Sequence, residues 1–357
     1  MPSKNYLILL VFLLGFLQAS AQQKELAALL REKHVTGIQL VHTKNNHVTN
    51  YTLGYRQANT RQPLTARSTM QAASLGKVVL AYVALRLHDQ GKLDLNKPLL
   101  SYYPYPRLHN EPRADRITAR MVLTHTSGLP NWADNPLAES WKTSALNLKF
   151  APDSCWNYSG EGFVLLQKTL EHITGKSWEQ LAQEEVFIPL KMTHSSYVWQ
   201  PRFAKNAATG HDKAGKPTEI RRFSEPNAGF SLLSTAPDYN RFVQALLQGT
   251  GLQPATHQLL LQPASEANRC GRPLTPTDAN IAWAYGLGLA TTSHGPALWH
   301  WGSNDDFEGF FMVFPDRDET LLFLTNSANG LKIADDVLRL LCGPGDYKAL
   351  QWLAEDK

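Results

Sequence analysis

The sequence carries little net charge and little compositional bias. Its 357 residues include 35 Lys and Arg against 31 Asp and Glu, which gives a formal charge of +4. It contains no block of five like charges and no short repeat. This small positive excess does not favour nucleic acid or an anionic membrane as a partner. With 23 Gly, 21 Pro and 43% hydrophobic residues, the composition also excludes collagen-like, mucin-like and long disordered chains.

Long hydrophobic runs are also lacking. The longest, Tyr6–Leu17, has 12 residues, whereas a membrane-spanning helix needs about 20. It follows Lys4 and precedes Ala19-Ser20-Ala21, a sequence that fits the cleavage site of a secretory signal peptide. We therefore expect residues 1–21 to be a signal peptide, and the mature chain to be exported to the periplasm or the extracellular space without a membrane span. An uncleaved anchor or a buried helix is the alternative.

Cysteine is scarce, and its spacing is not that of a metal site. Cys155, Cys270 and Cys342 form no CxxC pair, and the 12 His contribute no HExxH motif. The sequence therefore predicts no metal and no cofactor. Disulfides are permitted in an exported chain, but an odd number of cysteines leaves at least one thiol free or paired with another chain. The G-x-S-x-G motif of α/β-hydrolases is missing as well.

Strand patterns lie at the two ends of the chain, and helical patterns lie between them. Alternating β-rich segments predict strands at Val35–Thr43, His47–Arg56, Tyr285–Thr292, Ala297–Trp301, Gly309–Phe314 and Thr320–Thr325. Apolar residues at helical spacing, with caps and glycine stops, predict helices at Lys24–Lys33, from about Ser74 to Gly91, and at Phe163–Ile173, Thr235–Gly249 and Leu331–Leu341.

These elements predict one α+β domain over residues 22–357, because a sheet assembled from both termini would carry a helical insertion. The sheet lobe is expected at about residues 22–70 and 282–357, and the mainly helical lobe at about residues 74–281. The sequence leaves the oligomeric state open.

Three short motifs carry residues suited to acyl transfer. In Ser74-Leu-Gly-Lys77 a helix would place the lysine on the same face as the serine hydroxyl, within reach of its proton. Tyr158-Ser-Gly160 offers a phenol that can move a proton if a nearby cation lowers its pKa. His300-Trp-Gly302 lies on a predicted strand. Patterns this short are expected about once by chance, and most tyrosines simply pack, so no motif is decisive alone.

Taken in order along the chain, these motifs make it resemble the class C β-lactamase and penicillin-binding-protein-like serine hydrolases. The resemblance covers most of the chain after the signal peptide. It rests on Gln71-Ala-Ala-Ser-Leu-Gly-Lys77, Leu123-Thr-His-Thr-Ser-Gly-Leu-Pro130, Trp156-Asn-Tyr-Ser-Gly160, Ala228-Gly-Phe-Ser-Leu-Leu-Ser-Thr-Ala236, Tyr285-Gly-Leu-Gly288, His300-Trp-Gly302 and Leu324-Thr-Asn-Ser327. It implies a five-stranded antiparallel sheet flanked by helices, with a mainly helical subdomain.

The resemblance also implies roles for individual residues. Ser74 would be the acylated nucleophile at the start of a helix, and Lys77 would take its proton and lower the pKa of Tyr158. Tyr158 would exchange protons with Ser74 and with the leaving group. The backbone N–H groups of Ser74 and of Ser303, which follows Gly302, would form the oxyanion hole.

Two positions depart from the family pattern. Gly160 stands where β-lactamases usually have Asn, so it offers no side-chain amide to a substrate. His300 stands where many relatives have Lys, and with an ordinary pKa its positive charge would fade across about pH 6 to 7.5. Both changes favour less anionic substrates. His125 belongs to a phrase that is structural in the family, so we do not expect it to act as the base.

The sequence therefore predicts an exported serine hydrolase that forms an acyl-enzyme on Ser74. Its substrate would be an ester or amide in a small molecule or peptide, and its activity esterase- or peptidase-like. A true β-lactamase or D,D-peptidase is the second hypothesis, and a non-catalytic binding or scaffold protein with the same fold is the third. The substrate stays open, because the sequence does not place the loops that line the pocket.

Overall fold

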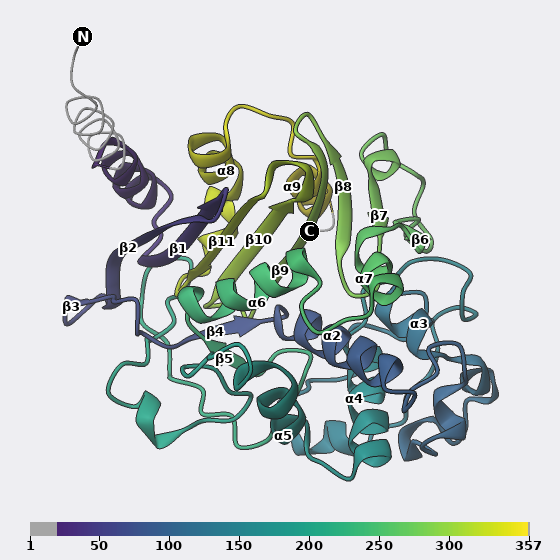
Figure 1. The fold of residues 1–357 in the computed structure, drawn as a ribbon. Helices are drawn as coiled ribbons and strands as arrows, with labels where there is room; N and C mark the ends of the chain where they lie inside the picture. Colours follow the sequence, from purple (N-terminus) through teal and green to yellow (C-terminus); the bar gives the residue numbers. More distant parts are fainter. Residues whose placement is uncertain (1–19, 356–357) are drawn as a thin grey trace.

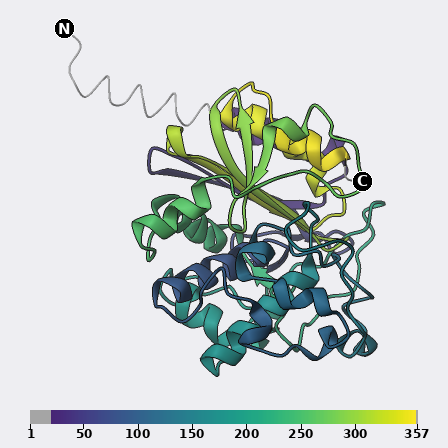
Figure 2. The ribbon, with the colours of Figure 1, turned by 90° about the vertical axis from the view of Figure 1, so that its right-hand side faces the viewer.

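The computed structural model describes residues 20–355, which form a large antiparallel sheet and a mainly helical half next to it (Figure 1). In the view of Figure 2, α8 (Ala334–Cys342) and α9 (Lys348–Glu355) lie beside the sheet, and the helices from the middle of the chain fill the other half. The α+β class and the assembly of the sheet from both ends of the chain are confirmed. The residue limits of the two lobes stay a prediction.

Nine strands of the described chain form the main sheet, so the expected number of five is wrong. Across the sheet they are β3 (Gln62–Pro63), β2 (His47–Gln57), β1 (Gly37–Lys44), β11 (Glu319–Thr325), β10 (Glu308–Phe314), β9 (Gly295–Ser303), β8 (Gly288–Thr292), β7 (Ile281–Trp283) and β6 (Ser265–Glu266). Strands β3, β6 and β7 have only two or three residues. Such short strands are too brief to show an alternating pattern in the sequence.

Alternate residues of the central strands face two separate apolar cores. On β10, Phe310 belongs to one core and Phe311 to the other. The N-terminal helix, residues 20–32, packs with α8 and α9 against the first face, whereas α6 (Ala236–Gln248) contacts β1 and β11 on the second. Strands β10 and β11 are therefore buried along their whole length. These two strands form the centre of the sheet. β9 pairs with β10 and contacts β4 next to the helical half.

Two helices of the helical half carry the first two motifs. α2 (Gly76–Asp89) is almost entirely buried, as expected for a helix that is apolar on nearly all sides. α4 (Gly160–Thr174) begins after Ser159, whose Oγ accepts a hydrogen bond from the N–H of Gly162 at 2.9 Å. It ends at Gly175, which has a φ of 67°. A side-chain cap and a left-handed glycine thus fix both ends of α4.

The chain continues beyond the last expected helix. The predicted Leu331–Leu341 segment begins in a short 3-10 turn and continues as α8, and α9 then follows after a Gly-Pro-Gly linker. Trp352 of α9 is fully buried, so this second helix completes the first core. The shorter helices elsewhere are α3 (Ala119–Leu123), α5 (Trp178–Ala182) and α7 (Pro254–Leu261).

The expected signal peptide, residues 1–21, lies almost wholly outside the described residues. Only residues 20 and 21 are described, and both belong to the N-terminal helix. Between residues 20 and 355 there is no helix whose length and hydrophobicity would allow it to span a bilayer.

A disulfide joins two segments that border the second motif. Cys155 and Cys270 are bonded across a sequence separation of 115 residues, and the neighbouring Trp156 and Arg269 form a β-bridge. In the described part of the chain, Cys342 is the cysteine that remains reduced, and it is buried. The structure therefore answers the pairing question that the sequence left open.

We expect one thiol per chain to react when the protein is denatured without reductant, and all three cysteines after reduction. Replacing Cys155 and Cys270 with serine should lower the free energy of unfolding by about 2–4 kcal/mol, because the crosslink restricts the unfolded chain. Thiol titration and chemical denaturation measure these effects. In the Cys342→Ala control no thiol should react before reduction. Three reactive thiols in unreduced wild-type protein would contradict the pairing.

Candidate active site

The structure brings the first two motifs together at the start of α2. Ser74 lies in the turn between β4 (Met70–Ala73), which pairs with β5 (Leu232–Ser234), and α2. Lys77 lies in the first turn of α2, and its Nζ is 2.9 Å from the Ser74 Oγ. The Lys77 Nζ also lies 4.8 Å from the centre of the Tyr158 ring. The three predicted catalytic side chains therefore converge on one point.

Backbone geometry lets β9 approach this turn closely. Ala73 has a φ of 50°, a left-handed conformation that is rare for a residue with a side chain. A Cβ at Gly302 would lie 2.5 Å from the carbonyl oxygen of Ala72 and 3.1 Å from the nitrogen of Ser74. Only glycine fits at this position, and Ser303 follows it at the edge of the pocket that also contains Ser74. The oxyanion-hole role of these two serine amides stays a prediction.

Lys77 is fully buried, although lysine normally carries a charge. Its Nζ donates a hydrogen bond to the carbonyl of Gly229 at 2.7 Å, and among residues 20–355 no carboxylate forms an ion pair with it. Burial lowers the pKa of Lys77 to about 7. A substantial share of Lys77 is therefore neutral at neutral pH, with a lone pair available for the Ser74 proton.

Tyr158 has the opposite shift. Its hydroxyl is buried and makes no well-formed hydrogen bond in the described structure. Burial raises the pKa of Tyr158 above its ordinary value, and the nearby Ser74 hydroxyl offsets only part of this change. The net lowering of the Tyr158 pKa that the resemblance implied is therefore wrong, because desolvation outweighs the contact that lowers it. Tyr158 is a phenol that can donate a proton, not a phenolate base.

His300 is fully buried on β9 and does not carry a charge near neutral pH. Its Nδ1–H donates to the carbonyl of Trp301 at 2.7 Å, which leaves the lone pair on Nε2. Burial, together with the nearby Lys77, lowers the pKa of His300 to about 3. The expected fading of a positive charge across about pH 6 to 7.5 is therefore wrong, because a buried imidazole is already neutral there.

His125 holds the backbone on both sides of Tyr158. Its carbonyl accepts a hydrogen bond from the N–H of Asn157 at 2.8 Å, and its Nδ1 accepts one from the N–H of Ser159 at 3.1 Å. Its ring lies 4.6 Å from the Tyr158 ring, centre to centre. Burial, together with His300 and Lys77, lowers the pKa of His125. These contacts agree with a positioning role rather than that of a base for Ser74.

A cavity of about 590 Å³ opens above Ser74, Tyr158 and Ser303. Several of the side chains that line it, among them Trp132 and Lys149, lie on loops outside the motifs, so sequence reasoning did not find them. The aromatic residues of the lining are Trp132, Trp156, Tyr158, Phe230 and Trp301, the amides are Asn131, Asn157 and Asn304, and the cations are Lys149, Arg269 and Arg272. Amides and positive charges therefore reach the cavity even though Gly160 and His300 supply neither.

A family model described as Beta-lactamase matches residues 23–341. The chain belongs to the beta-lactamase family. It is 24% identical over 338 residues to Penicillin-binding protein 4 of Amycolatopsis lactamdurans, which covers 90% of this chain and 88% of that protein. It is 23% identical over 316 residues to Protein flp of Staphylococcus aureus strain N315, which covers 83% of this chain. The match spans only 61% of the length of Protein flp.

Two solved structures share the fold. A class C beta-lactamase superposes with a TM-score of 0.75 at 19% identity, over 90% of this chain and 95% of the other. The octameric penicillin-binding protein homologue from Pyrococcus abyssi gives 0.74 at 21% identity, over 91% and 77%. The resemblance and the β-lactamase/transpeptidase-like fold are confirmed. Members of this family are generally serine hydrolases.

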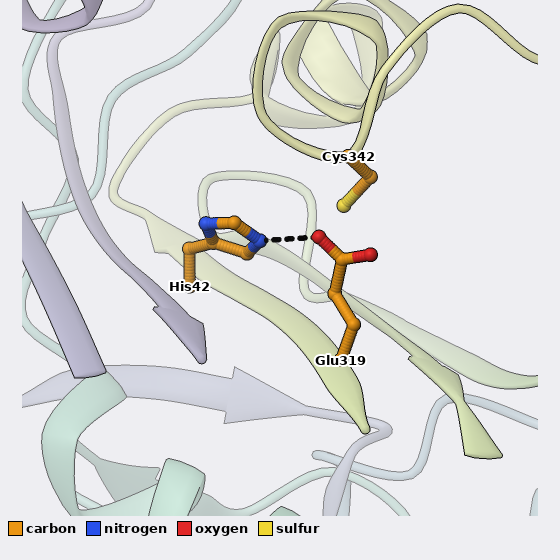
Figure 3. Close-up of side chains that lie close together, drawn as sticks. All are labelled: His42, Glu319 and Cys342. Carbon is orange, nitrogen blue, oxygen red and sulfur yellow. Dashed lines mark hydrogen bonds and ion pairs between the residues drawn. The ribbon is translucent and has the colours of Figure 1, made fainter. Parts of the chain in front are cut away.

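A second group of reactive side chains lies where β1, β11 and the end of α8 meet (Figure 3). His42 Nε2 is 2.8 Å from Glu319 Oε1, and the Cys342 thiol lies beside them. Lys44 and Arg317 also form ion pairs with Glu319. Burial and the nearby Glu319 raise the pKa of the Cys342 thiol, so it stays protonated. Positive charges already balance this carboxylate, and a protonated thiol is a poor metal ligand.

We expect the His300 imidazole to stay neutral throughout about pH 5 to 8, because burial and Lys77 lower its pKa to about 3. NMR of protein labelled with ¹³C-histidine measures this, and a His300→Gln variant assigns the signal. A titration with a midpoint near the ordinary histidine value would contradict the buried, neutral state.

Proposed function

We propose that the protein is an exported serine hydrolase that cleaves an ester or amide through an acyl-enzyme on Ser74. The observation that carries the proposal is the buried Lys77, whose Nζ lies 2.9 Å from the Ser74 Oγ and whose pKa is lowered to about 7. A lysine with this pKa is a base matched to neutral pH. A protein that only binds ligands has no need for such a residue, which argues against the scaffold hypothesis.

The acylation step uses the three side chains in sequence. The Ser74 Oγ attacks the substrate carbonyl carbon while its proton moves to the neutral Lys77 Nζ. The backbone N–H groups of Ser74 and Ser303 would stabilise the negative charge on the carbonyl oxygen. When the bond to the leaving group breaks, Tyr158 donates its proton to that group and regains one from Lys77. Lys77 is then neutral again, and Ser74 carries the acyl group.

Deacylation repeats the proton transfers with water. Lys77 accepts a proton from a water molecule as the water oxygen attacks the acyl carbon. The bond to the Ser74 Oγ then breaks, and the serine oxygen takes a proton back from Lys77. The products are a carboxylic acid and the unmodified enzyme.

A true β-lactamase or D,D-peptidase is the second candidate. The specific observation in its favour is the exposed Lys149 among the residues that line the cavity, because its charge suits a substrate carboxylate. Against it stands Gly160, which provides no side-chain amide at the second motif. Turnover of nitrocefin and of a D-Ala-D-Ala peptide discriminates it from an esterase.

Export is supported by two independent features. The apolar run over Tyr6–Leu17 and the small residues after it fit a signal peptide. The disulfide between Cys155 and Cys270 fits an oxidising compartment, since such bonds are rare in the cytosol. We therefore propose a periplasmic or extracellular location.

A fluorophosphonate probe should label Ser74 and no other residue, because among residues 20–355 this is the only serine whose hydroxyl contacts a buried lysine. Peptide mapping by mass spectrometry locates the adduct. Ser74→Ala should abolish labelling while circular dichroism stays unchanged, and Ser127→Ala, a buried serine of another motif, is the control that should still be labelled. An adduct that persists in the Ser74→Ala variant would overturn the assignment.

The kcat/KM for a neutral ester should rise with pH through an apparent pKa near 7, because Lys77 must lose its proton to act as the base. Lys77→Arg stays protonated and should lose at least about 100-fold in kcat/KM at every pH. The exposed Lys92→Arg serves as the matched control and should keep the wild-type profile. A profile that is flat or falls across this range contradicts Lys77 as the base.

A further inference from the structure

The indole of Trp132 occupies space that two glycines leave open. A Cβ at Gly160 would lie 2.4 Å from the Trp132 ring, and a Cβ at Gly229 would lie 2.8 Å from it. Both distances are too short for any real side chain to be present. The indole therefore fills the position where a side chain at residue 160 would begin. Trp132 can occupy this position only because residue 160 is glycine. The glycine therefore makes room for the indole, in addition to lacking the side-chain amide of an asparagine.

The ring of Trp132 is held in place by other aromatic side chains. The centre of its ring lies 6.0 Å from that of Trp141 and 5.7 Å from that of Phe230, both in edge-to-face geometry. The Lys77 Nζ lies 5.8 Å from the Trp132 ring centre. Trp132 is half-buried, and its remaining surface lines the cavity above Ser74. One wall of the cavity above Ser74 is therefore an aromatic surface close to the reacting groups.

A buried carboxylate fixes the backbone that carries this ring. The side chain of Glu161, in the first turn of α4, accepts hydrogen bonds from the N–H of Ala133 at 3.0 Å and from the indole N–H of Trp141 at 2.7 Å. Arg107 forms an ion pair with it at 2.7 Å. Glu161 and Arg107 are both buried. Because these bonds join groups of the protein itself and do not need a substrate, they hold the indole in position, and binding loses little entropy by ordering it.

We infer that Trp132 determines substrate specificity by offering a fixed surface to a planar apolar group, so that the enzyme prefers aromatic esters or amides. This inference rests on the proposed hydrolase function. An indole binds a flat ring through stacking or edge-to-face contact and burial of apolar area, and neither contribution needs the hydrogen bonds that an asparagine would give. Phe230 and Trp301 add further aromatic surface to the same cavity.

The test compares phenyl with small alkyl groups on each side of the scissile bond. One pair is p-nitrophenyl benzoate and acetate, and the other is phenyl acetate and ethyl acetate, all followed by pH-stat titration. Trp132→Ala should lower the kcat/KM ratio of phenyl to alkyl about tenfold in at least one pair. Trp199→Ala, which removes a half-buried tryptophan that does not line this cavity, should leave both ratios unchanged.

A Gly160→Ala variant tests whether the position of the Trp132 indole, and not only its presence, determines the ratio. Its added Cβ must displace the indole, so the same ratio should fall by a similar factor in the wild-type background. In the Trp132→Ala background the same change should have no further effect, because the ring it would displace is gone. Unchanged ratios in Trp132→Ala, or an equal effect of Gly160→Ala in both backgrounds, would overturn the inference.

Binding without turnover separates the two proposals. In a Ser74→Ala background, calorimetry should show that benzamide binds more tightly than acetamide, and that Trp132→Ala weakens benzamide binding about tenfold. If the wild-type protein cleaves no ester but this difference holds, the hydrolase proposal fails and the role of Trp132 stands. If esters are cleaved but neither the ratios nor benzamide binding respond to Trp132→Ala, the role of Trp132 fails alone.

Discussion

The burial of Lys77, with no carboxylate partner among residues 20–355, is the constraint on which the site depends. Lowering its pKa from 10.5 to about 7 corresponds to roughly 5 kcal/mol in favour of the neutral amine over the ammonium. Between these two pH values the unfolded chain binds a proton at Lys77 that the folded chain does not bind. This residue therefore makes the protein more stable as the pH rises through that window, and less stable as it falls. A buried lysine that weakens the fold at neutral pH points to a function.

The same burial sets the protonation of the neighbouring groups. Desolvation disfavours whichever form is charged, so it keeps Tyr158 a phenol and His300 a neutral imidazole while it makes Lys77 an amine. One physical cause thus produces a base, a proton donor and a hydrogen-bond acceptor side by side. The resemblance assigned these residues to one site, but the direction it implied for the pKa of Tyr158 was the opposite of the one found. The directions of these shifts depend on burial by segments far away in the sequence.

The sequence predicts best those features whose signal lies within a single helix or strand. Alternation along the long strands and the glycines that end α4 and α6 are local signals, and the elements they predicted lie close to the observed limits. The short strands β6 and β7 have too few residues to show an alternating pattern. The position of Trp132 was beyond prediction for another reason. It depends on contacts with Gly160 and Phe230, which belong to two motifs far apart in the sequence, and with Trp141, which belongs to no motif.

The site lies between the two halves of the molecule, which meet at more than one place near it. Ser74, Lys77 and Tyr158 belong to the helical half, whereas Gly302 and Ser303 come from β9 of the sheet. Because Gly302 has no Cβ, the sheet can approach the helical half closely at Ser74. The disulfide between Cys155 and Cys270 joins the segment that carries Tyr158 to the loop before β7.

Because the site is shared between the two halves, proton transfer and stabilisation of the oxyanion depend on different parts of the structure. The lysine, serine and tyrosine contact one another within the helical half, so their proton transfers do not require a fixed distance to the sheet. Stabilisation of the oxyanion does require it, because one of the two proposed amides lies on each side. A bulkier residue at position 302 would therefore separate the two amides while the Lys77–Ser74 contact remained. The close approach that only glycine permits is thus a condition for transition-state stabilisation, and burial of the lysine is a condition for proton transfer.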